Sequence, residues 1–270
     1  MLHIVTALPC EAKPLIKHYR LNGRQAENSF RIYENDVIRL IIAGIGKCAA
    51  AAACAYLQGA EPQAKHAWLN LGIAGHRDLD VGEAIMAHKI SDASTGISWY
   101  PAMPFKLPCQ TLELISLDQP NTEYGCNSGY DMEAAGFYST AIRFNSSELV
   151  QVFKVISDNR ANPAEQVSAP QAEQLINAQL DNIDVVIKQL FVLNTQMAQQ
   201  QNKTEIEAFQ QRWHFTVSQQ HQLQRLLQRW QARSDSGPDL NQFKTAKNSK
   251  AVIASLEKMI SNLPMRFDDK

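Results

Sequence analysis

The stretch from Tyr130 to Asp158 limits most strongly what this chain can fold into. It opens with Tyr-Asp-Met-Glu-Ala-Ala-Gly and closes with Val-Ile-Ser-Asp. Residues 134–144 predict a helix, and the apolar run 150–156 predicts a buried strand. Glu133 then lies where a loop enters the helix, and Asp158 lies just past the strand. Because ligands bind at the carboxyl ends of strands in open α/β sheets, we expect both carboxylates to face a cleft.

Length and charge indicate one large domain, alone or with a small module. The 270 residues are 45% hydrophobic and 20% charged, which is ordinary for a globular protein. Residues 1–192 hold 15 Lys and Arg against 20 Asp and Glu, and residues 193–270 hold 11 against 7, so the two parts carry −5 and +4. Such a small positive excess is typical of solvated surface, and we do not expect a nucleic acid as a partner.

Cysteine and histidine usage predicts no cross-link and no metal. The five cysteines are odd in number and lack paired spacing, which indicates neither a disulfide framework nor a zinc site, and we expect a reducing cytoplasm. The longest apolar block, residues 49–57, is too short to cross a membrane, so we expect neither secretion nor insertion. His214 and His221 lie seven residues apart without a third ligand.

A third carboxylate, Glu11, is predicted at the end of the first strand. Residues 3–7 predict a short buried strand, and residues 8–12 (Leu-Pro-Cys-Glu-Ala) predict the turn into a helix. An acidic residue at this place can simply favour a helix N-terminus. It can equally face a cleft at the strand end. The local sequence leaves both interpretations open.

Two glycine-containing segments follow predicted strands. Residues 43–47 (Ala-Gly-Ile-Gly-Lys) lie between a predicted hairpin at 31–42 and an Ala-rich helix. Residues 72–75 (Gly-Ile-Ala-Gly) are predicted to form a turn after a strand at 68–71. Glycines at such junctions let backbone N–H groups approach a ligand, or they only permit a tight turn.

The C-terminal part is predicted to be helical. A helix from about residue 171 to 193 should close the first domain, so we expect one domain at 1–193 and a helical extension at 194–270. Thr204 with Glu207 and Thr216 with Gln219 form capping boxes, which predict two helix starts. The extension also carries apolar stripes, which we expect to dock on the first domain or to bridge subunits: Phe209, Trp213, Leu227 and Trp230.

Four segments together resemble one superfamily. Asp-Met-Glu-Ala-Ala at 131–135, Ile-Ser-Asp at 156–158, Gly-Ile-Gly-Lys at 44–47 and Gly-Ile-Ala-Gly at 72–75 are similar to segments of the purine nucleoside phosphorylase and methylthioadenosine/S-adenosylhomocysteine nucleosidase superfamily. The resemblance covers about the first 190 residues. It implies an α/β fold of three layers, with a central mixed, twisted sheet flanked by helices. The chain departs from the usual residues of the family at Ile73, His76 and Arg77.

The resemblance also implies roles for individual residues. By it, Asp158 donates a proton to N7 of a purine, Glu133 holds the ribose 2′ and 3′ hydroxyls, and Glu11 activates a water. Met132 would pack against the sugar, and further substrate contacts would come from Gly44, Gly72, Ala74 and Gly75. The implied substrate is a purine nucleoside or a 5′-substituted adenosine, with no cofactor, bound by a homo-oligomer, most simply a dimer.

Three functions remain open at this point. The arginine-bearing first loop of hexameric phosphorylases is absent, and Glu11 in its place repels phosphate, which favours hydrolysis. Lys47 or Arg77 could still reach an anion, so phosphate as a co-substrate is an alternative. The short region between residues 91 and 130 favours a third function, a nucleoside-binding module without catalysis. That region has no motif for the base-stacking aromatic of the family, for which the candidates are Phe105, Tyr124 and Tyr130.

Overall fold

The computed structural model describes residues 1–24, 30–61, 65–120, 123–231, 233–234 and 236–263. The chain divides into two compact units. Unit 1 comprises Met1–Pro62 and His66–Asn194, and unit 2 contains Thr195–Lys270. Each unit has its own apolar core.

Unit 1 is built on a ten-stranded mixed sheet, whose order is β10-β6-β8-β9-β5-β1-β4-β3-β2 with β7 paired to β6. Parallel pairs join β4, β1, β5 and β10, while β6 and β9 run antiparallel to their neighbours β10 and β5. Because β5 pairs with β10 as well as with β9, part of the sheet closes on itself. The strands are β1 (Leu2–Thr6), β2 (Asn22–Arg24), β3 (Arg31–Glu34), β4 (Ile38–Ile42), β5 (Ala67–His76), β6 (Ala84–Asp92), β7 (Ser98–Trp99), β8 (Gln110–Ser116), β9 (Gly129–Asp131) and β10 (Val150–Asp158).

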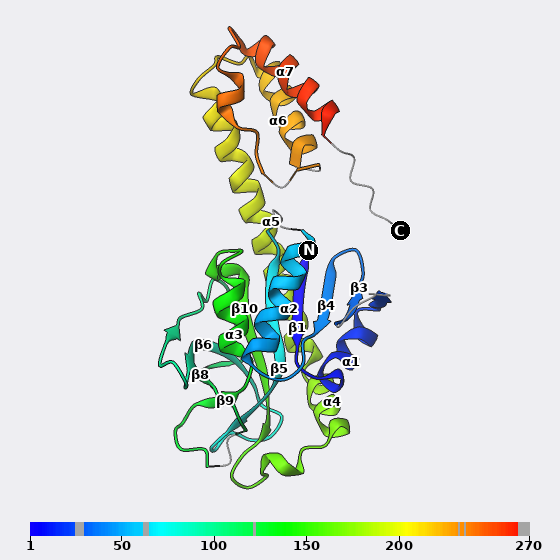
Figure 1. Ribbon diagram of the computed structural model, residues 1–270, viewed down its shortest axis with the longest axis vertical. Helices are drawn as coiled ribbons and strands as arrows, with labels where there is room; N and C mark the ends of the chain where they lie inside the picture. The colour runs from blue at the N-terminus through cyan, green and yellow to red at the C-terminus, as the bar shows by residue number, and fades with distance from the viewer. Residues whose placement is uncertain (25–29, 62–64, 121–122, 232, 235, 264–270) are drawn as a thin grey trace. The chain divides into compact units, whose positions relative to one another are not determined.

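Helices cover the sheet in two packed pairs (Figure 1). In the first pair, α2 (Lys47–Ala60) and α3 (Ala134–Ala141) lie in front of the sheet in Figure 1. Gly136 lets their backbones meet, because a Cβ there would overlap the carbonyl oxygen of Lys47. In the second pair, α1 (Pro9–His18) packs on α4 (Ala169–Ala178), and α5 (Leu180–Gln210) follows. The predicted α/β class with a central mixed sheet flanked by helices is confirmed.

Three element predictions were wrong in detail. Residues 72–75 form no turn, since they continue β5, in which they pair with β10. The single helix predicted over 171–193 is broken at Gln179, whose side-chain amide donates to the carbonyl of Gly82 at 2.7 Å. Residues 204–207 start no helix, because they lie inside α5. The short strands β7 and β9 were not predicted.

Unit 2 contains the end of α5, α6 (Val217–Gln231), the 3-10 turn η3 (Leu240–Phe243) and α7 (Ser249–Asn262). The Thr216 and Gln219 capping box is confirmed, with Thr216 N donating to the Gln219 side chain at 3.0 Å. The apolar stripes pack against one another in a core of their own: Phe209, Phe215, Leu223, Leu226, Leu227, Trp230, Phe243, Val252, Ile253, Leu256 and Ile260. The premise that these stripes need another surface was therefore wrong.

No helix in the described parts of the chain is long and apolar enough to cross a membrane.

Candidate active site

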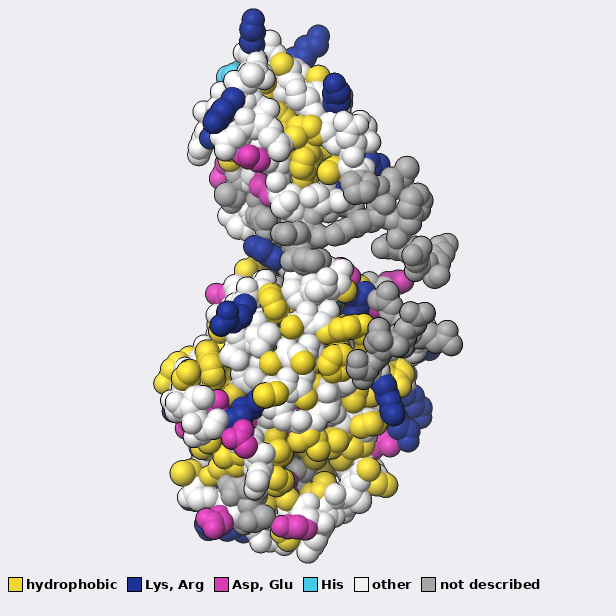
Figure 2. Space-filling model, viewed as in Figure 1, with side chains coloured by type: hydrophobic (Ala, Val, Ile, Leu, Met, Phe, Trp, Pro, Cys, Tyr) yellow, Lys and Arg dark blue, Asp and Glu magenta, His cyan; other side chains and the backbone are white. Residues whose placement is uncertain are grey.

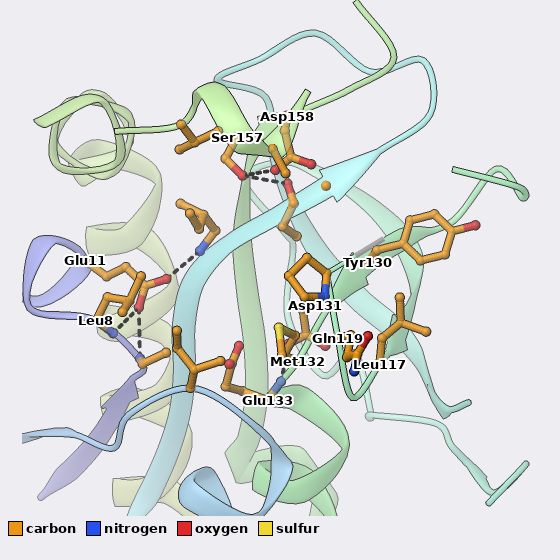
Figure 3. A pocket seen from close by; sticks show the side chains of 18 residues that line it. Leu8, Glu11, Leu117, Gln119, Tyr130, Asp131, Met132, Glu133, Ser157 and Asp158 are labelled. Atoms are coloured by element: carbon orange, nitrogen blue, oxygen red, sulfur yellow. Dashed lines mark hydrogen bonds between the residues drawn. The ribbon is translucent and has the colours of Figure 1, made fainter. Parts of the chain in front are cut away.

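A pocket of about 330 Å³ lies where β1, β5 and β10 end (Figure 3). We call it the carboxylate pocket, because four carboxylates and no Lys or Arg occur among the described residues that line it. Its volume lies in the range of small-molecule sites. The lining residues are Ala7, Leu8, Glu11, Ile45, Ile73, Ala74, Gly75, Leu117, Gln119, Pro120, Tyr130, Asp131, Met132, Glu133, Ser157, Asp158, Ala164 and Val167.

Glu11 is held by backbone donors at the first strand end. Its Oε2 accepts the N–H groups of Ala7 at 2.9 Å and Leu8 at 2.8 Å, and its Oε1 accepts that of Ile73 at 3.0 Å (Figure 3). Gly72 makes room for this side chain, since a Cβ there would lie 2.6 Å from Oε1. Burial raises the pKa of Glu11, although Lys154 and the backbone donors act against it. A carboxylate with a raised pKa is a stronger base, which suits proton removal from water.

Glu133 enters the pocket from the N-terminus of α3. Its Oε1 accepts the N–H of Gly46 at 2.9 Å, and its Oε2 lies 3.8 Å from Nζ of Lys154. Burial raises the pKa of Glu133 to about 7, with Lys154 opposing the rise and Asp131 adding to it. Glu133 therefore changes charge near neutral pH.

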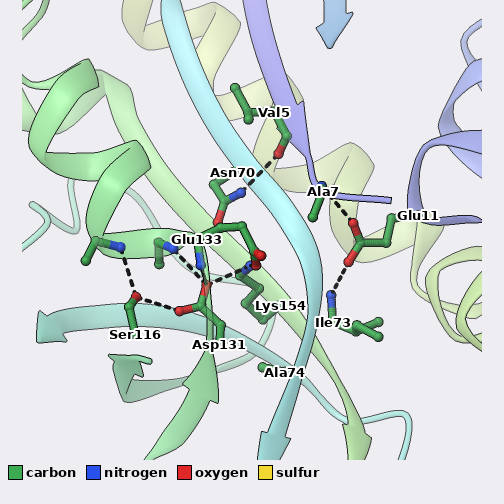
Figure 4. A network of polar contacts seen from close by, with 12 residues as sticks. Val5, Ala7, Glu11, Asn70, Ile73, Ala74, Ser116, Asp131, Glu133 and Lys154 are labelled. Carbon is green, nitrogen blue, oxygen red and sulfur yellow. Dashed lines mark hydrogen bonds and ion pairs between the residues drawn. The ribbon is translucent and has the colours of Figure 1, made fainter. Parts of the chain in front are cut away.

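Asp131 and Lys154 form a buried support behind Glu133 (Figure 4). Oδ2 of Asp131 lies 2.9 Å from Nζ of Lys154 and also accepts the N–H of Ala134 at 2.8 Å, which caps α3. Oδ1 accepts the hydroxyl of Ser116 at 2.6 Å. Burial acts to lower the pKa of Lys154, but Asp131, Glu133 and Glu11 outweigh it and raise that pKa. The lysine therefore stays charged and balances the carboxylates.

Sequence reasoning missed both members of this ion pair. Asp131 belongs to the quoted motif, but no role was assigned to it. Lys154 lies inside the apolar run of β10 and is 1% exposed. A lysine within a fully buried strand is costly unless it is paired. Its place in the apolar run 150–156 was therefore the sequence signal that a buried acidic partner exists.

Asp158 ends β10 and is held by two hydroxyls. Oδ1 accepts the hydroxyl of Ser157 at 2.5 Å, and Oδ2 accepts the hydroxyl of Tyr124 at 2.5 Å. Gly75 is needed beside it, because a Cβ there would overlap Oδ2 of Asp158 and lie 2.9 Å from Cε1 of Tyr124. Tyr124 itself is 1% exposed and is not among the pocket lining.

The remaining predicted residues divide between lining and support. Met132, Ala74 and Gly75 line the carboxylate pocket, whereas Gly44 and Gly72 do not. Gly44 adopts φ +90°, a conformation that favours glycine, and its N–H donates to the carbonyl of Ala7 at 3.0 Å. Of the aromatic candidates, Tyr130 lines the pocket and Phe105 does not.

The two cations considered for an anion are engaged elsewhere. Nζ of Lys47 lies 2.5 Å from Asp92 Oδ1 and 2.9 Å from Asp118 Oδ1. The guanidinium of Arg77 lies 2.6 Å from its neighbour Asp78. Neither Lys47 nor Arg77 lines the pocket. Within the described part of the chain, no group of three or more His, Cys, Asp or Glu could hold a metal ion.

Comparisons with known proteins give a fold but no sequence relative. No protein-family model matches the chain, and no curated protein matches it in sequence. Among solved structures, the 5′-methylthioadenosine nucleosidase of Arabidopsis thaliana in its apo form matches with a TM-score of 0.59 at 15% identity, over 70% of this chain and 95% of that one.

Two bacterial enzymes match in the same way. The 5′-methylthioadenosine/S-adenosylhomocysteine nucleosidase of Helicobacter pylori, bound to butyl-thio-DADMe-Immucillin-A, has a TM-score of 0.57 at 14% identity, over 70% of this chain and 97% of that one. The nucleosidase of Colwellia psychrerythraea, in complex with adenine, has a TM-score of 0.52 at 17% identity, over 67% of this chain and 94% of that one. About two thirds of this chain therefore has the fold of the methylthioadenosine/S-adenosylhomocysteine nucleosidases.

Proposed function

We propose that this protein hydrolyses the N-ribosidic bond of a purine nucleoside or a 5′-substituted adenosine. The observation that carries the proposal is the carboxylate pocket, in which Glu11, Glu133 and Asp158 meet at the strand ends with no Lys or Arg among the lining residues that the structure describes. The fold shared with nucleosidases supports the same reaction class. Fold alone does not determine function, so the argument rests on the pocket.

Each carboxylate meets one need of the reaction. Asp158 donates a proton to N7, and the electron pair of the C1′–N9 bond leaves with the neutral base. Glu133 accepts the 2′ and 3′ hydroxyls, which holds the ribosyl cation in place as it forms. Glu11 takes a proton from the water that attacks C1′, so the sugar leaves as free ribose or its 5′-substituted form. Met132 packs against the sugar.

Phosphorolysis is the weaker alternative because of charge. A phosphorylase must bind a dianion, typically with arginines that hold two oxygens at once. Lys47 and Arg77 are paired with aspartates outside the pocket, and the buried Lys154 already faces Asp131 and Glu133. Glu11 at the position of the nucleophile repels phosphate. These contacts favour water as the acceptor.

A nucleoside-binding module without catalysis is the second alternative. Binding requires no buried base, yet Glu11 is buried with a raised pKa and three backbone donors. Such perturbed groups cluster at catalytic sites. This observation favours an enzyme over a binder.

One experiment separates the three functions. The full chain is incubated with a panel of purine nucleosides and 5′-thio-substituted adenosines, with and without phosphate, and the products are separated by chromatography. We expect free purine and free sugar at the same rate in both buffers. Release that depends on phosphate, with the sugar 1-phosphate as product, would move the protein to the phosphorylases. Binding by calorimetry without any release would identify a binding module.

We further propose a homo-oligomer, most simply a dimer, formed through α2. The outer face of α2 is exposed and uncharged: Cys48, Ala52, Ala55 and Tyr56. Figure 2 shows hydrophobic side chains gathered on this side of unit 1, with few charged ones among them. Ile45, which is 57% exposed, precedes α2 and lines the carboxylate pocket, so a second copy on this face would adjoin the pocket.

Sedimentation of matched variants tests the dimer. Tyr56→Glu places a charge on α2 and should shift the mass to that of a monomer. Val185→Glu on α5 is the control, because Val185 is 39% exposed and Tyr56 is 43% exposed. A wild-type chain that sediments as a monomer at micromolar concentration would contradict the proposal.

A further inference from the structure

Tyr124 contacts Asp158 although it comes from a different part of the chain. Its hydroxyl donates to Oδ2 of Asp158, and its ring edge lies against Gly75 of β5. The pKa of Tyr124 is raised, first by burial and then by Asp158. The phenol therefore keeps its proton at neutral pH and acts as a donor.

The backbone of Tyr124 adopts a conformation that is unusual for its residue type. Its φ is +45°, in the left-handed region that non-glycine residues rarely adopt. Residues in such conformations persist where surrounding contacts hold them, and they cluster at functional sites. Among these contacts are those with Asp158, Gly75 and Tyr130, whose ring centroid lies 6.2 Å away at 70°.

The two oxygens of Asp158 are not equivalent. Oδ2 is confined between the backbone of Gly75 and the hydroxyl of Tyr124. Oδ1 accepts the hydroxyl of Ser157, which has a second acceptor in the carbonyl of Ala74 at 3.3 Å. When Ser157 turns its hydrogen to Ala74, Oδ1 is free to carry a proton of its own. Figure 3 shows Ser157 and Asp158 together at one end of the carboxylate pocket.

We propose that Tyr124 is a positioning residue that holds Oδ2 of Asp158 and thereby assigns the transferable proton to Oδ1. This inference rests on the proposed nucleoside hydrolysis. The proton on Oδ1 passes to N7 of the purine as the C1′–N9 bond breaks, and the bonding electron pair leaves with the base. Tyr124 keeps its own proton throughout, and the resulting carboxylate is held by both hydroxyls until it regains a proton from solvent.

In this arrangement Tyr124 acts on the proton transfer through Asp158. Removal of the phenol hydroxyl frees the carboxyl group to turn, so the protonated oxygen faces the purine for a smaller share of the time. The proton-transfer step slows, whereas substrate contacts elsewhere in the pocket stay. Once Asp158 is replaced by asparagine, the hydroxyl has no acid to position and its loss should change little.

The test is a double-mutant cycle with the full chain and a purine nucleoside that the wild type cleaves. Tyr124→Phe, Asp158→Asn and the double variant are compared in kcat and KM, and thermal unfolding checks that each one folds. The matched control is Tyr19→Phe. It also removes a hydrogen bond from a tyrosine hydroxyl to an aspartate, because the hydroxyl of Tyr19 donates to Asp184 at 2.6 Å, outside the carboxylate pocket.

We expect Tyr124→Phe to lower kcat by about 10- to 100-fold with KM within about threefold, in line with the loss of part of a general-acid contribution. Asp158→Asn should lower kcat by about 10²- to 10⁴-fold, and the double variant should equal Asp158→Asn alone. Tyr19→Phe should match the wild type.

Two results would overturn the role of Tyr124 while leaving the hydrolase intact. The first is a kcat of Tyr124→Phe within twofold of the wild type. The second is a double variant whose kcat lies below that of Asp158→Asn by the same factor by which Tyr124→Phe lowers the kcat of the wild type. A folded Asp158→Asn variant with unchanged kcat, or a wild type that releases no purine, would overturn the proposed function and this inference with it.

Discussion

Nζ of Lys154 lies 2.9 Å from Oδ2 of Asp131, in a place where neither side chain reaches solvent. The pair joins the middle of β10 to the end of β9, and it lies next to Glu133 and within electrostatic reach of Glu11. Lys154 thus acts as a buried counterion for the carboxylate pocket. Loss of that cation would leave several carboxylates unbalanced in a medium of low polarity.

Replacement of Lys154 by methionine should therefore destabilise unit 1 strongly. Removal of one partner from a buried ion pair costs about 3–5 kcal/mol in the free energy of unfolding. Lys13→Met is the matched control, because Lys13 pairs with Glu173 at 2.9 Å but is 70% exposed, and such pairs contribute about 0–1 kcal/mol. Urea unfolding of both variants measures the difference, and equal losses would show that Lys154 is not the counterion.

Glu11→Gln should abolish hydrolysis if Glu11 activates the water. The amide cannot accept the proton, so product formation should fall by at least about 10²-fold. One end of the new side chain places an NH₂ group against a backbone N–H of Leu8 or Ile73, so circular dichroism must confirm that the variant folds. Glu173→Gln provides the control, because Glu173 on α4 is 34% exposed and pairs with Lys13 outside the carboxylate pocket. Free sugar at the wild-type rate from folded Glu11→Gln would exclude Glu11 as the base.

Ribose binding should weaken as the pH falls through about 7. Burial raises the pKa of Glu133 to about 7, so the carboxylate that accepts the ribose hydroxyls is replaced by the protonated form below that pH. Between pH 8 and pH 6 the ionised share falls about tenfold. Calorimetry with a 9-deazapurine nucleoside, whose C–C bond cannot be hydrolysed, should show the Kd rising by about that factor. Glu133→Gln should bind weakly with little change over this range, and a wild-type Kd independent of pH would refute the assignment.

A histidine far from the pocket should make unit 1 less stable in acid. The ring of His3 packs 4.3 Å from that of His66 and 4.5 Å from that of Trp68, and burial, with His66 and Arg39, lowers the pKa of His3 to about 2. The unfolded chain binds a proton at this residue near pH 6.5 and the folded chain does not. Stability from His3 is thus present above pH 6.5 and decreases as the pH falls below it.

His3→Phe should remove that part of the pH dependence. Between pH 7.5 and 5.5 the free energy of unfolding should fall about 1 kcal/mol less in the variant than in the wild type. The readout is a difference between two pH values, so a constant packing cost cancels. His88→Gln, on an exposed residue of β6, should behave as the wild type does. Identical slopes for His3→Phe and the wild type would contradict the assignment.

We propose that residues 1–193 form the catalytic domain and 194–270 an extension with its own core. A chain that ends at Asn194 keeps the buried part of α5 that packs in unit 1: Ile183, Val186, Ile187 and Leu190. It should fold and release purine with unchanged kcat, as chromatography and circular dichroism would measure. A higher KM would assign the extension to the site, and a changed number of subunits per particle in sedimentation would assign it to subunit contact. Failure to fold would reject the boundary.

The strand ends and the site motif were accessible from sequence because they depend on local chemistry. Apolar runs predict where β1 and β10 end, and the carboxylates Glu11 and Asp158 stand directly beside those ends. Lys154 was not found because hydropathy averages over a strand, and a single lysine hardly changes the average. Its partner Asp131 ends β9, and the two residues are paired only because β9 and β10 meet in space beside β5.

The contact of Tyr124 with Asp158 and the bounds of α5 were not predicted, for different reasons. Tyr124 lies in a left-handed loop conformation, which has no periodic signal, and its acceptor is 34 residues away in sequence. The capping pattern at 204–207 occurs inside α5, where intrahelical hydrogen bonds take the place of the cap. A local motif alone cannot tell a helix start from a helix interior.

The two glycines of β5 bear on how this pocket can change over evolution. Gly72 leaves space for Glu11, and Gly75 leaves space for Asp158 and Tyr124. The carboxylates thus occupy the volume where an ordinary strand would hold its own side chains. Any amino-acid substitution at either glycine adds at least a Cβ and displaces an acid before it can alter specificity. New substrates would therefore be reached through the loops at the rim, such as Leu117 to Pro120, while this strand stays unchanged.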